Sequence, residues 1–430
     1  MAQKSLLKFS VINFFILSFL YSKLTIIHCG LFINGVNDKS LKVVSILIEK
    51  DRIIDINEGY TDPGPEDVLI DLNSYTVLPG LMDMHTHLSS ESNPNKYMEN
   101  FTLDLDDYAY QSILYARRTL FAGFTTVRDL GGPVNNSLRD AIKKNQLIGP
   151  RIFSAGKAIT TTGGHTDPTN GVKLNLMRNP GPSTGVVNGV DEAIKAVRQQ
   201  YKNGADLIKI TATGSILSLG KSEEYPQFKE DEIIAIVETA ADYGMHVAAQ
   251  AHGAEGIKRA IRAGVKSIEH GTLMDDEAIN LMKKYSVFYV PTILGGEFIS
   301  EKAKKDSYYP DLVKQKAKNF GPKIRETFKK AYLENVKIAF GTDSGVSYHG
   351  ENGKEFMYMV EAGMSPMEAI KSATISAAEL LGIKDTLGTI EIGKIADIIA
   401  IKGNPLEDIS TLQNVKFVMK NGIIYKNLTN

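Results

Sequence analysis

The sequence contains a single cysteine, Cys29, in 430 residues, so an intrachain disulfide cannot form. It also lacks an excess of charge of either sign, because 49 lysines and arginines stand against 50 aspartates and glutamates. Such a chain has no strongly basic surface to attract nucleic acid and no acidic tail. It contains no internal repeat and no low-complexity segment. These absences exclude nucleic acid as the expected partner and favour a small molecule.

Long apolar runs are scarce, and the clearest one stands near the N-terminus. The stretch MAQKSLLK carries two lysines and precedes the apolar run FSVINFFILSFLYS. This order is typical of a secretory signal, and the run is too short to span a bilayer of roughly 30 Å comfortably. We predict a signal peptide over residues 1–22, export to the periplasm or the cell exterior, and no stable membrane insertion after signal removal. A retained membrane anchor is the alternative.

What is present is the composition of an ordinary globular protein. Hydrophobic residues make up 43% of the chain, charged residues make up 23%, and 37 glycines indicate many tight turns. Single cores stop growing at about 250 to 300 residues. A chain of 430 residues is therefore expected to form one large unit and one smaller unit.

The pattern of apolar residues divides the chain into β and α/β parts. Residues 23–79 and 385–430 read as short strands and turns, and we predict that they form the two parts of one small β-sandwich. Residues 80–384 alternate short apolar segments with amphipathic helical segments, which is typical of βα units. The candidate strands are 81–87, 124–130, 151–157, 207–211, 246–252, 267–270, 287–292 and 338–343. Eight such units predict an α/β fold of the (β/α)8 TIM-like barrel type.

Histidine, lysine and aspartate side chains lie at the ends of several of these predicted strands. They are His85, His87, Lys209, His252, His270 and Asp343. In a barrel, the carboxyl ends of the strands meet at one rim and carry the chemistry. A lone strand histidine or aspartate is most often structural, but the coincidence of six at one rim predicts a metal site. Imidazole and carboxylate ligands suit zinc and related divalent ions.

Lys209 lies between isoleucines in the stretch ADLIKITATG, residues 205–214. An ammonium group in apolar surroundings is costly, so this lysine must be paired, neutral or chemically altered. An ion pair with Asp206 or another nearby acid is one possibility. Schiff-base chemistry is disfavoured, because nothing in the sequence indicates a carbonyl substrate.

Five stretches carry a resemblance to a known family. They are PGLMDMHTHL (79–88), KITATG (209–214), AHGAEGIKRAIRAGVKSIEHGTLMD (251–275), FGTDSGVSYHGENGKE (340–355) and GTIEIGKIADIIAI (388–401). They resemble the amidohydrolase superfamily, and KITATG, SIEHGT and GTDSG are similar to its branch of Xaa-Pro dipeptidases and carboxypeptidases. Ochratoxin-hydrolysing amidases look similar as well.

The resemblance implies a binuclear metal-dependent hydrolase that cleaves the amide bond of dipeptides or N-acyl amino acids, ochratoxin-like amides included. It implies two divalent ions, with zinc expected, and CO2 bound to Lys209 as an N6-carboxylysine that bridges them. Burial agrees with this implication, because it favours the neutral amine that takes up CO2.

One position departs from the family pattern. The branch commonly has H-x-H-G at the end of strand 5, and this sequence has QAHG, with Gln250 at the first position. His252 is two residues further on and should face the same side, so it could act as the ligand or as a substrate contact. Gln250 puts the affinity of the second metal site in question.

The resemblance also suggests roles for further residues. Asp343 is predicted to be the general base, and His165 in GGH is predicted to hold the carbonyl oxygen and the oxyanion. Tyr225 matches a position that meets the terminal carboxylate of the substrate. Arg128 could meet the same carboxylate, or could pair with Asp129 or another acid inside the barrel.

Two other functions are compatible with the same scaffold. One is a deaminase or cyclic-amide hydrolase of the imidazolonepropionase type, against which Lys209 argues, because such enzymes usually lack this lysine. The other is a non-catalytic relative that serves as a scaffold, and Gln250 is the one apparent ligand loss that favours it. Relatives often form symmetric homo-oligomers, which this sequence neither supports nor excludes.

Overall fold

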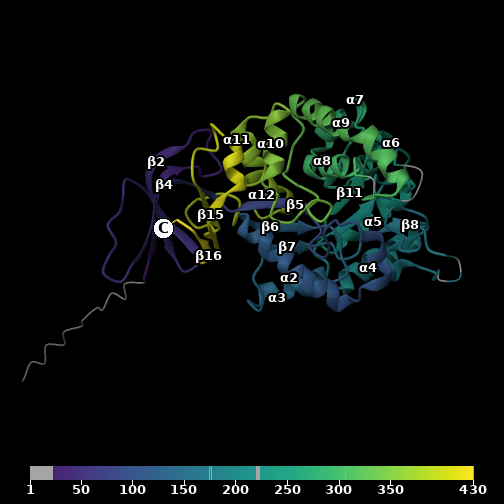
Figure 1. Cartoon of the computed structure of the whole chain (residues 1–430), viewed down its shortest axis with the longest axis horizontal. Helices are drawn as coiled ribbons and strands as arrows, with labels where there is room; N and C mark the ends of the chain where they lie inside the picture. The colour runs from purple at the N-terminus through teal and green to yellow at the C-terminus, as the bar shows by residue number, and fades with distance from the viewer. Residues whose placement is uncertain (1–22, 174, 176, 219–222, 306, 430) are drawn as a thin grey trace, which may run out of the picture.

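The two ends of the chain form one β-sheet in the computed structural model (Figure 1). The structure describes residues 23–173, 175, 177–218, 223–305 and 307–429, so the predicted signal peptide over residues 1–22 lies outside the described residues. The seven strands run in the order β16-β15-β14-β4-β1-β2-β3. They are β1 (Thr25–Phe32), β2 (Leu41–Glu49), β3 (Arg52–Glu58), β4 (Val68–Pro79), β14 (Ile398–Ile401), β15 (Val415–Lys420) and β16 (Ile423–Asn427). The predicted β-sandwich is thus visible in part, as one mixed sheet.

The alternation of side chains along a strand explains the core of this sheet. Strand β1 pairs in parallel with β4 and antiparallel with β2, and β14 pairs antiparallel with β4. Ile27, Cys29, Ile46 and Ile398 are fully buried in one apolar cluster of this sheet. Because successive side chains on a strand point to opposite faces, residues two apart share the buried face.

The middle of the chain is an α/β unit with parallel strands. Its sheets have the orders β5-β6-β7 and β10-β11-β12-β13, and a short pair is formed by β8 and β9. The strands are β5 (Leu81–Thr86), β6 (Phe124–Asp129), β7 (Arg151–Ser154), β8 (Thr160–Thr161), β9 (Val186–Val187), β10 (Ile208–Thr211), β11 (Val247–Ala251), β12 (Ser267–His270) and β13 (Phe288–Val290). Seven of the eight predicted strands therefore form close to their expected places.

The eighth predicted strand, over 338–343, is not continuous. Isolated parallel bridges join Ile338 to Tyr289 and Ser344 to Thr86. Asp343 has φ 57, which turns the backbone out of the extended conformation that a strand requires. The segment still lies beside β5, because the Asp343 N–H donates to the His85 carbonyl at 2.8 Å.

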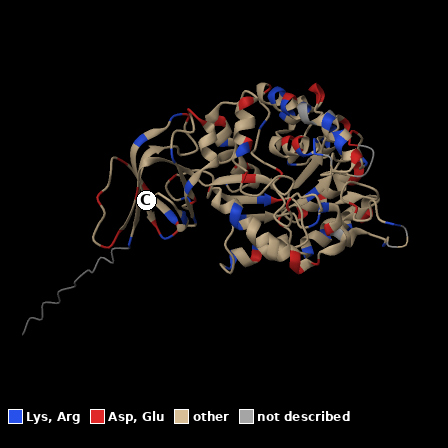
Figure 2. Cartoon of the chain, in the orientation of Figure 1, with Lys and Arg blue, Asp and Glu red and all other residues tan. Residues whose placement is uncertain are grey.

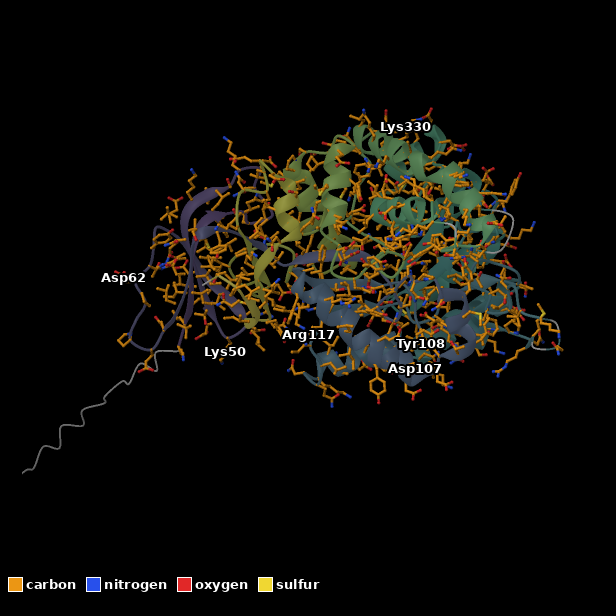
Figure 3. All side chains as sticks on the ribbon, in the orientation of Figure 1. Lys50, Asp62, Asp107, Tyr108, Arg117 and Lys330 are labelled. Carbon is orange, nitrogen blue, oxygen red and sulfur yellow. The ribbon has the colours of Figure 1, made fainter. Side chains whose placement is uncertain are left out.

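Helices connect the parallel strands and cover the unit (Figure 1). They are α1 (Lys96–Thr102), α2 (Leu105–Phe121), α3 (Asn135–Lys143), α4 (Val190–Lys202), α5 (Glu230–Asp242), α6 (Ala254–Arg262), α7 (Asp276–Tyr285), α8 (Ile293–Lys302), α9 (Asp311–Leu333), α10 (Lys354–Glu361), α11 (Pro366–Ser372) and α12 (Ile375–Leu381), with 3-10 turns at Pro182–Thr184 and Ile409–Gln413. Helix α2 buries Ala116 and Leu120, while Asp107 and Arg117 are exposed (Figure 3). Residues four apart lie on one helix face, which explains this division.

The surface carries both signs of charge. Lysines, arginines, aspartates and glutamates are interspersed along the helices in the view of Figure 2. Across the described part of the chain, no helix is long and apolar enough to cross a membrane.

Candidate active site

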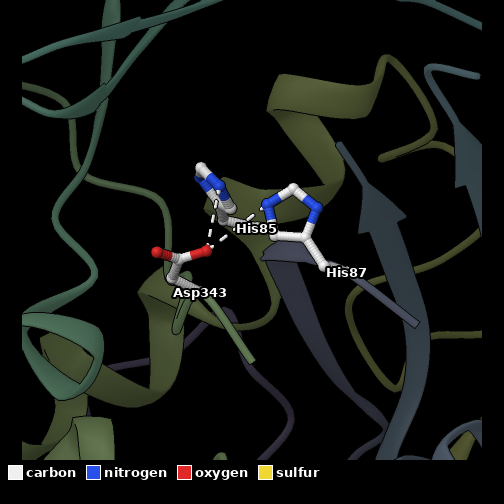
Figure 4. Close-up of side chains that lie close together, drawn as sticks. All are labelled: His85, His87 and Asp343. Atoms are coloured by element: carbon white, nitrogen blue, oxygen red, sulfur yellow. Dashed lines mark ion pairs between the residues drawn. The ribbon is translucent and has the colours of Figure 1, made fainter. Parts of the chain in front are cut away.

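Three side chains of types that commonly bind metals meet at the edge where β5 ends (Figure 4). His85 is the fifth residue of β5, His87 follows the strand, and Asp343 comes from the segment beside it. Asp343 Oδ1 lies 3.5 Å from His85 Nε2 and 3.4 Å from His87 Nε2. One ligand atom from each residue lies within 4.8 Å of the other two. This is a donor set that suits a divalent ion such as zinc.

The two histidines of β5 are oriented through their other ring nitrogens. His85 Nδ1 lies 3.0 Å from Glu269 Oε2, and His87 Nδ1 lies 2.8 Å from the Gly131 carbonyl oxygen. A carboxylate and a carbonyl only accept hydrogen bonds, so each Nδ1 carries the proton. The lone pair of each ring is therefore on Nε2, which faces Asp343. This arrangement is typical of metal-binding histidines.

His252 and His270 lie beside this cluster. His270 is the last residue of β12 and pairs with Ala251 of β11, which places His252 next to it. The rings of His252 and His270 stack at 4.9 Å with 2° between their planes. Rings of His85 and His270 are also 4.9 Å apart. The structure thus brings the rings of His85, His87, His252 and His270 together.

A pair of threonines anchors these two rings. His252 Nδ1 lies 2.8 Å from Thr272 Oγ1, and His270 Nδ1 lies 2.6 Å from Thr292 Oγ1. The Thr292 hydroxyl donates to the Pro291 carbonyl at 2.7 Å, so it accepts from His270. His270 therefore also keeps its lone pair on Nε2.

Several buried ring nitrogens have no hydrogen-bond partner among the described residues. They are Nε2 of His85, Nε2 of His252 and Nδ1 of His165 at this site, and Nε2 of His246 just before β11. A buried polar atom without a partner costs free energy unless something else binds it. Burial also lowers the pKa of His87, His165 and His252 to about 3, so these rings are neutral at pH 7. Neutral rings with free lone pairs fit a metal or a substrate at this place.

Lys209 lies on β10 with 2% of its surface exposed. Removal from water lowers the pKa of its amine to about 8, although Asp343 and Glu269 work in the opposite direction. Asp206 is bound by Arg139 Nη1 at 2.7 Å, so it is not the partner of Lys209. Burial therefore favours the neutral amine, the form that reacts with CO2.

Asp343 is held in a strained backbone conformation. Its φ of 57 is matched by φ 69 at His270 and φ 53 at Thr292. Non-glycine residues rarely adopt this region, and such strain concentrates at functional sites. Burial raises the pKa of the Asp343 carboxyl to about 7.

A pocket opens over these groups. It is lined by His87, His165, Ser215, Ile216, Leu217, Gln250, His252, His270, Thr292, Gly295, Gly296, Ile299, Ile324, Asp343 and Val346. His165 is positioned there by its backbone N–H, which donates to Gln227 Oε1 at 3.1 Å. Gln250 lines the same pocket with 4% of its surface exposed. His165, the predicted oxyanion residue, and Gln250, which departs from the family pattern, therefore both line this pocket.

The structure does not bring two of the predicted substrate contacts to the pocket. Arg128 is fully buried and pairs with Glu269 at 2.7 Å, with further bonds to Ser267 and the Met84 carbonyl. Its position matches the second alternative, pairing with an acid inside the unit. Tyr225 is 67% exposed and does not line the pocket.

A match to a protein family indicates the class of enzyme to which this site belongs. The model of the amidohydrolase family matches residues 76–424, most of the chain. The chain belongs to the amidohydrolase family.

Relatives within the amidohydrolases narrow the branch. Ochratoxinase of Aspergillus niger is 32% identical, over 94% of this chain and 87% of its own. A crystal structure of a Xaa-Pro dipeptidase with methionine bound in the active site is 53% identical, with a TM-score of 0.92, over 94% of this chain and 100% of that one. A prolidase in complex with N-methylphosphonate-L-proline is 32% identical, with a TM-score of 0.87 over the same shares. The chain is a dipeptidase-like amidohydrolase that acts on C–N amide bonds.

Glu269 belongs to this amidohydrolase site, although the sequence pattern did not single it out. Glu269 is fully buried between Arg128 and His85 and orients the latter. It stands in the predicted buried strand SIEH, directly before His270. A charged residue inside a buried strand was the signal that singled out Lys209, and it applies to Glu269 equally.

Proposed function

We propose that this amidohydrolase is a metal-dependent carboxypeptidase or dipeptidase that cleaves dipeptides or N-acyl amino acids, ochratoxin-like amides included. The observation that carries the proposal is the convergence of His85 Nε2, His87 Nε2 and the Asp343 carboxylate within 4.8 Å. The relatives support the substrate class, since one structure contains methionine and another contains an analogue ending in L-proline. Both ligands are amino acids or end in one.

The residues that would hold the metals form two sets. His85, His87 and Asp343 would hold one ion, and His270 with His252 or Gln250 would hold a second. Lys209, as N6-carboxylysine, would bridge the two, with zinc as the expected metal. The second set is the weaker one, because the amide oxygen of Gln250 is neutral.

The parallel strands would close into a (β/α)8 barrel around these residues. Backbone hydrogen bonds support closure at two gaps, since the Ile159 N–H donates to the Lys209 carbonyl and the Met84 N–H to the Phe340 carbonyl. Closure would bring the strand ends to one rim.

In the proposed mechanism, Asp343 would transfer a proton and His165 would bind the carbonyl oxygen. A bound divalent ion would supply an activated water and a polarised carbonyl. Asp343, whose pKa burial raises to about 7, would take the proton of the attacking water and pass it to the leaving amine. His165, neutral because burial lowers its pKa to about 3, would hold the carbonyl oxygen. The surrounding pocket would keep bulk water out of the reaction.

A deaminase or cyclic-amide hydrolase is the alternative function on this scaffold, and a non-catalytic scaffold protein is the third. Ammonia release from a panel of amino-substituted heterocycles would favour the deaminase. We also propose that the protein is exported, on the basis of the charged and apolar segments in residues 1–22.

The test combines metal analysis with a Lys209→Ala variant. We expect the purified protein to contain divalent metal, and the variant to lose roughly a thousandfold in kcat/KM, about 4 kcal/mol of transition-state stabilisation. Short carboxylates such as acetate should restore part of this activity, because they can replace the bridging carbamate. Lys202→Ala, on the exposed face of α4, is the matched control.

Two results would contradict the proposal. A metal-free protein that hydrolyses no amide after metal and bicarbonate are supplied would exclude the hydrolase. Full activity of Lys209→Ala without added carboxylate would exclude the bridging role.

A further inference from the structure

A second cavity, here called the side chamber, opens beside the reaction pocket. It is lined by His87, Ser90, Ser92, Lys96, Tyr97, Leu217, Tyr309, Gly345 and Val346. Three of these residues, His87, Leu217 and Val346, also line the reaction pocket. The two cavities are therefore neighbours that share one wall.

The walls of the side chamber are mainly apolar. Leu217 and Val346 face Tyr97 of α1 and Tyr309 of the segment before α9. The Tyr97 hydroxyl donates to the Leu217 carbonyl at 3.0 Å, which fixes that wall. Tyr309 is 7% exposed, and its hydroxyl lies 3.4 Å from Ser92 Oγ. With these hydroxyls engaged, the rings offer apolar surface to a ligand.

The charged side chain at the chamber is neutralised locally. Lys96 Nζ lies 3.0 Å from Glu99 Oε2, and Glu99 Oε1 accepts from Asn93 Nδ2 at 2.6 Å. Because Lys96 is already paired with Glu99, a substrate carboxylate would gain little from this ammonium, and the chamber suits an uncharged group.

The proposed substrate has an acyl half and a leaving half, and these observations indicate which of the two the side chamber binds. The leaving half carries a free carboxylate, which the neutral Lys96–Glu99 pair does not attract. The acyl half carries no carboxylate, and an apolar acyl chain or an apolar first side chain matches the aromatic and aliphatic walls.

We infer that the side chamber binds an apolar acyl group, aromatic or branched aliphatic, on the carbonyl side of the scissile amide, and that Tyr309 determines this specificity. The inference rests on the proposed function and names its preferred substrates. They are N-acyl amino acids with a bulky apolar acyl group, and dipeptides whose first residue is large and apolar.

The test uses the complete metal-loaded enzyme and two substrate series. One series varies the acyl group from acetyl to phenylacetyl on a constant C-terminal residue, and the other varies the C-terminal residue on a constant acyl group. Wild type should prefer phenylacetyl over acetyl by about tenfold or more in kcat/KM, and Tyr309→Ala should abolish most of that preference. Tyr309→Phe is the matched control, because it keeps the ring and should keep the preference.

Tyr309→Ala should leave selectivity within the C-terminal series unchanged. If selectivity shifts in that series instead, or if the acyl preference survives Tyr309→Ala, the assignment is wrong. Thermal unfolding of each variant shows whether a loss reflects a folding defect, and Tyr97→Ala, which removes the other aromatic wall and should also reduce the phenylacetyl preference, serves as a second probe if Tyr309→Ala does not fold.

Binding separates failure of this inference from failure of the proposed function. If wild type hydrolyses no member of either series, the proposed function fails, and calorimetry with phenylacetate and acetate decides the inference. Phenylacetate should bind more tightly than acetate and should lose about tenfold in affinity in Tyr309→Ala. Equal binding of both acids to wild type would overturn the assignment.

Discussion

At the scale of single residues, the interior of the site contains a chain of buried polar groups. Arg128 pairs with Glu269, and Glu269 in turn orients His85. All three are fully buried. Buried charges are tolerated only when they are paired and hydrogen-bonded, so each member depends on the next.

Replacing Glu269 should therefore affect both stability and metal binding. We expect Glu269→Gln to lower the free energy of unfolding by about 3 to 5 kcal/mol, because Arg128 keeps its charge without a counter-charge. Metal affinity should fall by about 10- to 100-fold, because His85 loses the carboxylate that orients it. Urea denaturation in a chelator and zinc titration would measure the two effects.

A double variant serves as the control for Glu269→Gln. Adding Arg128→Met removes the unpaired charge, so most of the stability should return while metal affinity stays low. Unchanged stability in the single variant would contradict the role of the Arg128–Glu269 pair.

Metal binding should depend on pH through Asp343. Burial raises the pKa of this carboxyl from 3.8 to about 7 in the metal-free protein, so the carboxyl is protonated below pH 7. Since the folded pKa lies above the unfolded value, ionisation of this group destabilises the metal-free fold as pH rises from 3.8 toward 7. His87 and His252 stay neutral down to about pH 3, so they do not contribute to the pH dependence of metal binding above that value.

A bound ion must displace the Asp343 proton. Zinc affinity should therefore fall by at least about tenfold for each pH unit below 7, because the Lys209 amine, whose pKa is lowered to about 8, must also lose a proton before it can bind CO2. Competition titration against a chelating dye from pH 5.5 to 7.5 would measure it, with Asp343→Asn as the control that removes the part of the slope due to Asp343. The same affinity at both ends of the range would refute the assignment.

At the scale of elements, the strand ends are fixed by the loops that pack on them. The His252 N–H donates to Thr213 Oγ1 at 2.9 Å, which ties the end of β11 to the loop after β10. Gly253 follows at the start of α6. A Cβ at Gly253 would lie 1.8 Å from the Glu224 carbonyl oxygen, so only glycine allows this close approach.

Gly253→Ala should displace this loop or His252 itself. We expect a loss of about 1 to 3 kcal/mol in stability and about tenfold in kcat/KM. Gly181→Ala is the matched control, since a Cβ there meets nothing within 4 Å, and its stability should stay within about 0.5 kcal/mol of wild type. Equal behaviour of the two variants in thermal unfolding and kinetics would show that the contact is unimportant.

At the scale of the whole molecule, the sheet and the α/β unit share one core. Leu78 of β4 and Val415 of β15 belong to the same buried cluster as Phe124 of β6. Arg151 of β7 pairs with Asp397, just before β14, at 2.8 Å. The chain leaves the sheet after β4 and returns to it at β14. Neither part can therefore separate without exposing this core.

The molecule should therefore unfold as one unit. Arg151→Ala leaves the Asp397 carboxylate, with 4% of its side chain exposed, without its partner, and should cost about 1 to 3 kcal/mol. Calorimetry should show a single transition at a lower temperature, and exposed Arg198→Ala should leave it unchanged. Two separate transitions would contradict a shared core.

The fold could be predicted from the sequence more completely than the site. The order of parallel strands was predictable, because apolar segments of strand length alternate with amphipathic segments of helix length. The break at Asp343 was not, because a left-handed backbone conformation at an aspartate depends on the packing around it. The places of His85, His87, His252 and His270 followed from strand ends, and the pairing of Arg128 with a buried acid was one of two predicted alternatives, whereas the exposed position of Tyr225 did not follow from the sequence.

The sequence by itself determined which residue types stand at the ends of the strands, and hence a metal-compatible site with Gln250 as its unusual member. Only the tertiary structure decided which groups meet there. Glu269 rather than a substrate pairs with Arg128, and the side chamber forms between helix α1 and a loop that lies 120 positions further along the chain. The physical reason is that side-chain alternation is a local property of a strand, while contacts between loops depend on how separate elements pack.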